Sequence, residues 1–463
     1  MELIMDKETY KALQKIVGPE QVTDRETDRR CYAYDATQIQ ALPDGVVFPG
    51  STQEIAEILK LANRFRFPVI PRGAGSGFSG GSVPIQGGLV LVLLRMNRIK
   101  KIDTNNLLAV VEPGVITRDL QQAVEAYGLF YPPDPSSLNF STLGGNVAEC
   151  AGGGRAVKYG VTRDYVLGLE VVLPGGEILR TGVQTSKGVV GYDLTRLMVG
   201  SEGTLGIITE MTLKLIPLPE SRQTILAFFH RLAQATETVV EIFRQGILPS
   251  ILEFMDQSSI VCVEDYLKIG LPTQAHALLL IEVDGDKEAV ARQGLTIQRI
   301  CQEMGAEGVK LATSPQEAEE LWKARRAISP AVFRLRPHKI NEDIVVPRDK
   351  IPEAIEGFQE IGRRLNLVII SFGHAGDGNI HVNVMYDRNN PDENEKAPQA
   401  VLEIFKKVLD LGGTLSGEHG VGLTKAPYLN LELAPATISL MKKIKDLFDP
   451  NHILNPGKIF PTE

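Results

Sequence analysis

Three histidines and a glutamate stand in two short glycine-containing motifs in the C-terminal part of the chain. His374 and His381 lie in GHAGDGNIHVN, and Glu418 and His419 are adjacent in SGEHGVG. Imidazole nitrogens and carboxylate oxygens bind divalent metals, and two histidines with one carboxylate leave positions open for a substrate. We therefore predict a catalytic metal site of His374, His381 and Glu418. Zinc is the first expectation, and iron or manganese also suits these ligands.

The sequence between the first two histidines predicts the hairpin that would bring them together. Asp377-Gly378 is a favoured two-residue turn between β-strands. Such a turn would place His374 directly opposite His381, with Cβ atoms about 4.5–5.5 Å apart. The period of two along a strand then puts Asn383 on the same face as His381, where it could contact a substrate. His419, next to the third ligand, is left as a base, because imidazole accepts protons near neutral pH.

Three glycine-rich segments in the N-terminal half predict a site for an extended, phosphate-containing ligand. PRGAGSGFSGG lies between two apolar strands, and TLGGNVAECAGGG and GSEGTLGIIT follow further along the chain. Glycines let backbone N–H groups approach a pyrophosphate, because they adopt positive φ and carry no side chain. The first segment is not a P-loop, since no GK[ST] follows. It is not a Rossmann fingerprint either, since its glycines precede a strand rather than begin a helix.

Together these segments resemble the flavin-binding fold of the vanillyl-alcohol-oxidase superfamily. From about residue 40 to Lys458 the chain is similar to the branch that contains the flavin subunit of glycolate oxidase, D-lactate dehydrogenases and D-2-hydroxyglutarate dehydrogenases. The resemblance implies FAD as the cofactor. Ser76 occupies the position at which some relatives attach FAD through a histidine, which implies non-covalent flavin. The residues that match FAD-binding positions are Pro71, Arg72, Gly73, Ala74, Gly75, Ser76, Gly77, Ser79, Gly80, Thr142, Gly145, Asn146, Glu149, Gly152, Gly153, Gly154, Gly206, Ile207, Ile208, Asn455 and Lys458.

The same resemblance assigns substrate binding to WKARRAISP and to the HKINEDIVVP that follows it. Arg325, Ser329 and Lys339 match positions that hold the substrate carboxylate or its distal group. A guanidinium can bind a carboxylate through two parallel hydrogen bonds. Arg325 is chosen over Arg326 from the motif alignment alone, and Lys339 stands one residue short of the spacing in some relatives.

These implications describe FAD-dependent oxidation of a small D-2-hydroxy acid, namely D-lactate, glycolate or D-2-hydroxyglutarate. Arg325 would orient the substrate, His419 would take the hydroxyl proton, and the flavin would accept the hydride. The relatives imply an electron-accepting partner, either an iron–sulfur subunit or an electron-transferring flavoprotein. Two alternatives stay open: a flavin-containing transferase of the same fold, related to alkyl-dihydroxyacetone-phosphate synthase, and a flavin electron carrier with no substrate of its own.

Length and local patterns indicate the elements that must position these residues. The chain has 463 residues, whereas single hydrophobic cores stop growing at about 250–300. We predict an α+β protein with a two-subdomain FAD-binding domain of vanillyl-alcohol-oxidase type at 1–218. An antiparallel-sheet cap domain with flanking helices would bind the substrate at 219–411, and 412–463 would complete the active site and return to the FAD domain. Ser51 and Glu54 have the capping-box spacing that begins a helix.

Net charge and cysteine content limit the classes of binding partner and the cellular compartment that we expect. The net charge is −8 and no basic block occurs, which argues against nucleic acid or anionic membrane as a partner. The longest apolar run, Leu89 to Leu94, is far shorter than the roughly 20 residues of a transmembrane span. Four scattered cysteines indicate a reducing compartment and offer no iron–sulfur ligation. We expect a cytoplasmic location, with any membrane association made through a partner.

Overall fold

The computed structural model describes residues 7–461 and divides the chain into two units. The first unit contains the chain up to Ala151, then Val161–Leu218 and the residues from Glu418 onward. The second contains Gly152–Gly160 and Pro219–Gly417. The short segment 152–160 therefore lies outside the unit to which the sequence division assigns it. No helix in the described range is long and apolar enough to cross a bilayer.

The first unit is built on two main sheets. A mixed sheet has the order β1-β2-β4-β3, an antiparallel sheet has the order β5-β6-β10-β8-β9, and β11 pairs with β7. The strands are β1 Val22–Thr23, β2 Gly45–Val47, β3 Val69–Arg72, β4 Leu89–Val92, β5 Ile99–Asp103, β6 Leu108–Val111, β7 Leu129–Phe130, β8 Val166–Val172, β9 Ile178–Gly182, β10 Ile207–Lys214 and β11 Ile216–Pro217.

Helices of the first unit pack on these sheets. The predicted capping site is confirmed, because Ser51 Oγ accepts a hydrogen bond from the Glu54 N–H at 3.2 Å and the helix begins at the next residue. Apolar side chains of α1 and α3 form one core with the mixed sheet, including Leu13, Ile55 and Leu89. The helices are α1 Lys7–Val17, α2 Glu26–Cys31, α3 Thr52–Phe65, α4 Thr117–Glu125, α5 Leu143–Glu149, α7 Leu194–Met198, α15 Leu429–Glu432 and α16 Pro435–Phe448.

The second unit contains the predicted antiparallel sheet. It has seven strands in the order β15-β12-β14-β13-β17-β18-β16, and every neighbouring pair is antiparallel. The apolar runs TILAFF, ALLLIEV and IHVNVMY lie in its strands, and LVIISF does so from its second residue, Val368. The strands are β12 Ser221–Phe229, β13 Ile251–Asp256, β14 Ala277–Gly285, β15 Gly308–Leu311, β16 His338–Val345, β17 Val368–His374 and β18 Asn379–Tyr386.

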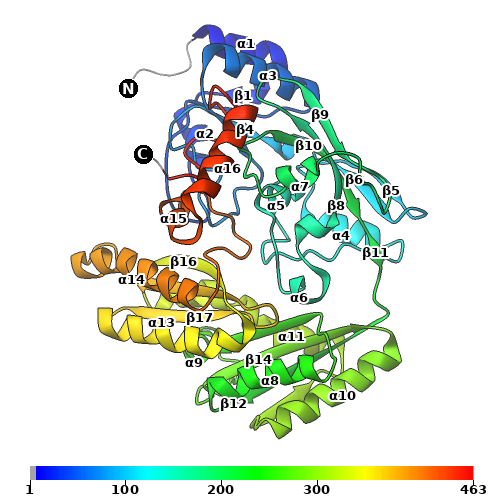
Figure 1. Cartoon of the computed structure of the whole chain (residues 1–463), viewed down its shortest axis with the longest axis vertical. Helices are drawn as coiled ribbons and strands as arrows, with labels where there is room; N and C mark the ends of the chain where they lie inside the picture. The colour runs from blue at the N-terminus through cyan, green and yellow to red at the C-terminus, as the bar shows by residue number, and fades with distance from the viewer. Residues whose placement is uncertain (1–6, 462–463) are drawn as a thin grey trace. The chain divides into compact units, whose positions relative to one another are not determined.

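Helices cover both faces of this sheet (Figure 1). On one face, apolar residues of α9, α11 and α12 pack with Met255, Leu280 and Phe372. On the other face, α10 lies against Gln223 and α13 against Ile369, with α14 beside α13 and α8 beside α10. The helices are α6 Ala156–Tyr159, α8 Leu232–Arg244, α9 Gln257–Leu267, α10 Lys287–Glu303, α11 Pro315–Arg326, α12 Ile328–Ala331, α13 Ile351–Leu365 and α14 Pro391–Asp410.

The hairpin between β17 and β18 differs from the predicted one. His374 lies opposite Asn379, and His381 lies opposite Phe372, so the expected direct pairing of His374 with His381 is wrong. The loop has four residues, Ala375–Gly378, rather than two. The N–H groups of its last two residues both donate to the His374 carbonyl oxygen, which closes this longer turn. The register therefore differs by two residues, which leaves both histidines on the same face as diagonal neighbours.

Candidate functional site

The first glycine-rich segment forms a backbone cradle in the first unit. Gly73 lies so close to the Thr142 side chain that a Cβ at this position would collide with it. Gly75 and Gly80 have φ angles of +68° and +78°, which an L side chain rarely adopts. Within the described part of the chain, the N–H groups of residues 74–77 donate to no other atom. Backbone amides grouped in this way fit the phosphates of a dinucleotide cofactor.

Two C-terminal residues predicted to contact FAD return to this cradle. The Asn455 side-chain amide donates to the carbonyl oxygens of Gly81 and Glu202, both at 2.8 Å. Lys458 Nζ donates to the Val83 carbonyl oxygen at 2.7 Å. Burial lowers the pKa of Lys458 to about 8, although acidic neighbours oppose this. The structure thus brings residues from three distant parts of the sequence to the predicted FAD site.

Helix α5 carries the second glycine-rich segment. Thr142 Oγ1 accepts a hydrogen bond from the Gly145 N–H at 3.3 Å and so caps the helix. Asn146, in the first half of the helix, is buried. Glu149 ends the helix, and burial together with the neighbouring Glu202 raises its pKa well above the ordinary value. A raised pKa favours the uncharged acid, which does not repel an anionic ligand.

Glu202, which sequence reasoning missed, holds the loop that contains SGEHGVG. Its carboxylate accepts hydrogen bonds from the N–H groups of Val421 and Gly422, both at 2.7 Å. In the same unit His419 stacks on Phe78 of the first glycine-rich segment, with ring centroids 5.4 Å apart. The predicted base is therefore packed against the predicted FAD cradle. Glu202 belongs to GSEGTLG, but nothing in that motif indicates which loop its carboxylate would reach.

The sheet of the second unit presents buried polar groups on one face. His374 and His381 are 7% and 8% exposed, and their ring centroids are 5.2 Å apart in a T-shaped arrangement. Asn383, two residues further along β18, is fully buried. Its amide oxygen and nitrogen have no hydrogen-bond partner among the described residues. Because an unpaired buried amide is costly, Asn383 is suited to bind a ligand.

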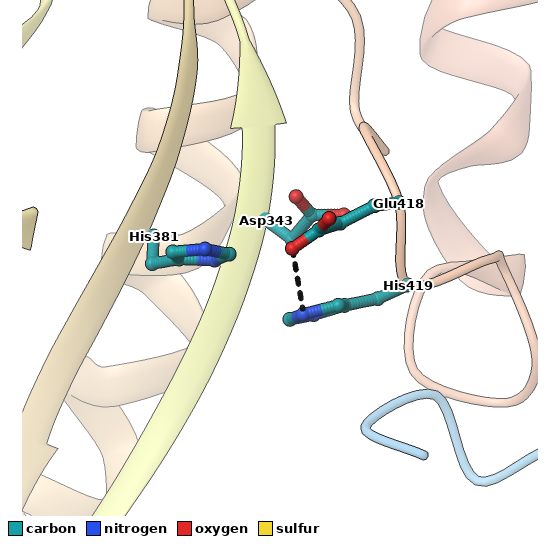
Figure 2. A group of neighbouring side chains, drawn as sticks. All are labelled: Asp343, His381, Glu418 and His419. Atoms are coloured by element: carbon teal, nitrogen blue, oxygen red, sulfur yellow. Dashed lines mark ion pairs between the residues drawn. The ribbon is translucent and has the colours of Figure 1, made fainter. Parts of the chain in front are cut away.

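Figure 2 shows a group of neighbouring side chains that could hold a metal ion. One potential ligand atom from each member lies within 4.8 Å of the others, and the members are Asp343, His381, Glu418 and His419. Glu418 Oε1 is 3.8 Å from His419 Nε2. The predicted ligands His381 and Glu418 belong to this group. The predicted ligand His374 does not, although its ring neighbours that of His381.

Asp343 was not predicted, and its contacts show how it organises this group. Its Oδ1 accepts a hydrogen bond from Asn379 Nδ2 at 2.5 Å, and its Oδ2 accepts one from the Gly417 N–H at 3.0 Å. One carboxylate therefore ties the start of β18 to the residue immediately before Glu418 in the chain. Asp343 is fully buried, and the only sequence signal for it was its position directly before the apolar residues Ile344, Val345 and Val346.

Arg325 reaches the same sheet face through an acid that the sequence analysis also missed. Its Nε donates to Glu253 Oε2 at 2.6 Å, and its guanidinium lies 4.9 Å from the Phe372 ring centroid. Glu253 Oε1 pairs with His374 Nδ1. Burial raises the pKa of Glu253, but Arg325 and His374 outweigh this effect and hold the pKa below its usual value. The predicted substrate arginine and one predicted metal ligand thus share a carboxylate.

Two other predicted substrate residues, Lys339 and Ser329, contact each other. Lys339 Nζ donates to Ser329 Oγ at 3.0 Å, and burial lowers the pKa of Lys339 to about 8. Arg326, the alternative to Arg325, instead pairs on the surface with Glu319. The geometry therefore favours Arg325 as the arginine of the site.

Two family models match the chain. The model described as "FAD binding domain" matches residues 43–182, and "FAD linked oxidases, C-terminal domain" matches residues 218–459. The chain is 50% identical over 461 residues to glycolate oxidase subunit GlcD of Bacillus subtilis (strain 168), covering 99% of this chain and 98% of that protein. It is 39% identical over 457 residues to D-lactate dehydrogenase of Anaerostipes hadrus, covering 96% of each.

Solved structures share the fold at low sequence identity. P-cresol methylhydroxylase with substrate bound matches with a TM-score of 0.82 and 19% identity, over 98% of this chain and 96% of that one. An alkyldihydroxyacetonephosphate synthase matches with a TM-score of 0.77 and 20% identity, over 98% and 85%. The predicted α+β fold of vanillyl-alcohol-oxidase type is confirmed.

Proposed function

The chain belongs to the FAD-linked oxidase family of oxidoreductases, and from this premise we propose that it oxidises a small D-2-hydroxy acid to the 2-oxo acid. The observation that supports this proposal best is the buried polar face of the second unit. There His374 and Arg325 share Glu253, and His381 lies beside His374. A pair of histidines next to a partly buried guanidinium is suited to a metal and a substrate that carries a hydroxyl beside a carboxylate.

We assign the metal to His374, His381 and Glu418. When bound, a zinc, iron or manganese ion would supply a Lewis acid for the substrate hydroxyl. His381 and Glu418 belong to the group in Figure 2, and the His374 ring neighbours that of His381. Imidazole and carboxylate donors fit such an ion, and Asp343 is already engaged by two hydrogen bonds. His419 takes the hydroxyl proton as general base.

The substrate is held by side chains of the second unit. Arg325 uses its Nε for Glu253, which leaves the two terminal nitrogens for the substrate carboxylate. Asn383 offers an unpaired amide, and Lys339 with Ser329 binds the distal group. D-lactate, glycolate and D-2-hydroxyglutarate differ in that distal group, and the two relatives are named for glycolate and D-lactate.

The first unit binds FAD without a covalent bond. When bound, FAD would accept the hydride from C2 of the substrate. Ser76 stands where a covalent link would need a nucleophilic side chain such as histidine, and the cradle of glycines 73 to 80 holds the phosphates through backbone amides. Acid precipitation should release yellow flavin into the supernatant, whereas flavin that stays with the pellet would refute non-covalent binding.

Electrons leave the chain to a protein partner, either an iron–sulfur subunit or an electron-transferring flavoprotein. The four cysteines show no CxxC spacing, and one relative is named as a subunit of glycolate oxidase. The purified chain should reduce an artificial dye when given a hydroxy acid. It should not reduce NAD, and rapid NAD reduction by the single chain would contradict the assignment.

Anaerobic mixing with a panel of D- and L-2-hydroxy acids tests the proposed reaction. A D-2-hydroxy acid should bleach the oxidised flavin, while its L enantiomer should not. The alternative activity is that of a flavin-containing transferase of the same fold, and an alkyldihydroxyacetonephosphate synthase is among the fold neighbours. Flavin that stays oxidised with every acid would contradict the dehydrogenase and favour that alternative or an electron carrier.

A further inference from the structure

Glu253 is a deeply buried acid of the second unit that contacts two residues of the proposed site, His374 and Arg325. It stands in β13 between Leu252 and Phe254, and it is 2% exposed. It lies directly opposite His374 on the neighbouring strand, so both side chains point to the same face of the sheet. Burying a carboxylate is costly unless its oxygens are paired. The hydrogen-bond partners of Glu253 therefore explain how this position tolerates a buried acid.

Each oxygen of Glu253 has its own partner. Oε1 pairs with Nδ1 of His374, and Oε2 accepts from Nε of Arg325 at 2.6 Å. When Nδ1 of an imidazole carries the proton, Nε2 is the ring nitrogen that can bind a metal. When Nε of an arginine is engaged, the terminal nitrogens stay available for an anion. The Glu253 carboxylate thus orients His374 to bind a metal ion and Arg325 to bind the substrate carboxylate.

The carboxylate has little freedom to move. A Cβ on Gly154 would come within 2.9 Å of Glu253 Oε1 and 3.0 Å of Ile251 Cγ2, so the backbone of segment 152–160 lies against this oxygen. The Arg325 guanidinium is also packed over Phe372, 4.9 Å from the ring centroid. Both partners of Glu253 are therefore held in one arrangement.

We infer that Glu253 is a positioning residue that couples the metal site to the substrate-carboxylate site, by fixing the His374 tautomer and the Arg325 guanidinium together. The inference rests on the proposed function, in which these two residues bind the metal and the substrate. A buried ion pair with only a structural role would stabilise the sheet without changing the affinity for either ligand. These two roles give different results when the Glu253 charge is removed.

Glu282 provides a matched control. It is 7% exposed, it lies on the adjacent strand β14, and it contacts the same helix α11 through Trp322 Nε1 at 3.4 Å. Its carboxylate also accepts a hydrogen bond from Thr224 Oγ1 at 3.3 Å. Glu282→Gln therefore removes a buried charge from the same sheet and helix without touching His374 or Arg325.

The test is a titration of the FAD-loaded enzyme with Zn²⁺ against a chromophoric chelator, followed by steady-state kinetics. Glu253→Gln presents an amide that cannot accept from both partners, so zinc affinity should fall about 10–100-fold, as for other lost partners of ligating histidines. KM for the hydroxy acid should rise in the same variant while the flavin spectrum stays unchanged. Glu282→Gln should keep zinc affinity within about twofold of the wild type.

Glu253→Asp covers the case in which the glutamine variant does not fold. It keeps the charge but is one methylene shorter, so it cannot reach both partners, and zinc affinity should again fall. A folded Glu253→Gln or Glu253→Asp enzyme with wild-type zinc affinity would overturn the inference and leave the proposed reaction intact. A wild-type enzyme that binds no zinc, iron or manganese would overturn the proposed metal site itself, and the inference with it.

Discussion

The two functional regions of this chain are built by different means. In the first unit, glycine-rich segments present backbone amides, and residues such as Asn455 bond to the backbone of those segments. In the second unit, side chains from strands that are distant in the sequence meet on one sheet face, as Glu253 and His374 do. The glycine-rich cradle depends on the backbone conformation of its residues. The polar side chains on the sheet face meet only when the strands pair in the correct register. We therefore expect substitutions to separate cofactor binding from metal and substrate binding.

Loss of a metal ligand should have the largest effect on turnover and should spare the flavin. His381→Ala removes a donor of the group in Figure 2, and Lewis-acid stabilisation contributes several kcal/mol, so activity should fall on the order of 10³-fold or more. Metal content, measured by elemental analysis, should fall with it, while bound FAD stays at wild-type levels.

The control is His419→Ala, which should keep metal and FAD yet slow turnover by about 10²–10⁴-fold, because it removes only the proposed base. A fully active His419→Ala enzyme would move the base elsewhere. A His381→Ala enzyme that keeps its metal would exclude His381 as a ligand.

Removal of the substrate guanidinium should have the next largest effect. A lost hydrogen bond to a charged group costs about 1.5–3 kcal/mol, so Arg325→Ala should lower kcat/KM by roughly 10–100-fold without loss of FAD. Arg326→Ala is the matched control, because Arg326 forms an ion pair with Glu319 on the surface. Equal kinetic effects of the two substitutions would show that Arg325 has no special role.

A glycine substitution in the cradle should show the opposite pattern. Gly80 has φ of +78°, and a Cβ there would lie 2.9 Å from Leu423 Cδ1. Since left-handed strain alone costs about 1–2 kcal/mol, Gly80→Ala should weaken FAD binding by about tenfold or more and leave zinc affinity unchanged. Gly128→Ala is the control, because it has φ of +69° but nothing within 4 Å. Equal FAD affinities in both variants would show that the cradle does not depend on this position.

The smallest expected effect is a pH dependence from Lys339. Burial lowers the pKa of Lys339 to about 8, so its ammonium loses its proton as the pH rises through that value. If the ammonium binds the substrate's distal group, kcat/KM should decline above about pH 8. Lys339→Arg should move the decline to higher pH, because a guanidinium stays charged. The same decline in Lys339→Ala would show that another group is responsible.

The sequence predicted the glycine-rich cradle of the first unit better than the polar sheet face of the second unit. Ser51, the glycine-rich segments and the apolar strand runs are local signals, and the elements form where they indicate. The His374–His381 register was wrong because Asp377-Gly378 is part of a four-residue turn rather than the whole of a two-residue one. That choice depends on hydrogen bonds of the closed turn, which the motif alone does not specify.

The acids that organise the site were missed for a related reason. Glu253 is 121 residues from His374 in the sequence, and Asp343 is 74 residues from Gly417. An acid flanked by apolar residues, such as Glu253 between Leu252 and Phe254, is visible in the sequence, but its partner depends on the strand order of the whole sheet. The histidines, the glutamate and the arginine of the proposed site could therefore be predicted from local motifs. The hydrogen bonds of Glu253 and Asp343 that link these motifs could not.

The central claim is that a metal held by His374, His381 and Glu418 is required for hydride transfer to the flavin. The most direct measurement is anaerobic stopped-flow reduction of the bound flavin by a D-2-hydroxy acid, with metal-loaded and chelator-treated enzyme compared at equal FAD content. The account predicts rapid bleaching in the loaded enzyme and almost none after chelation, with bleaching restored by added metal. Bleaching at the full rate in a demonstrably metal-free enzyme would contradict it.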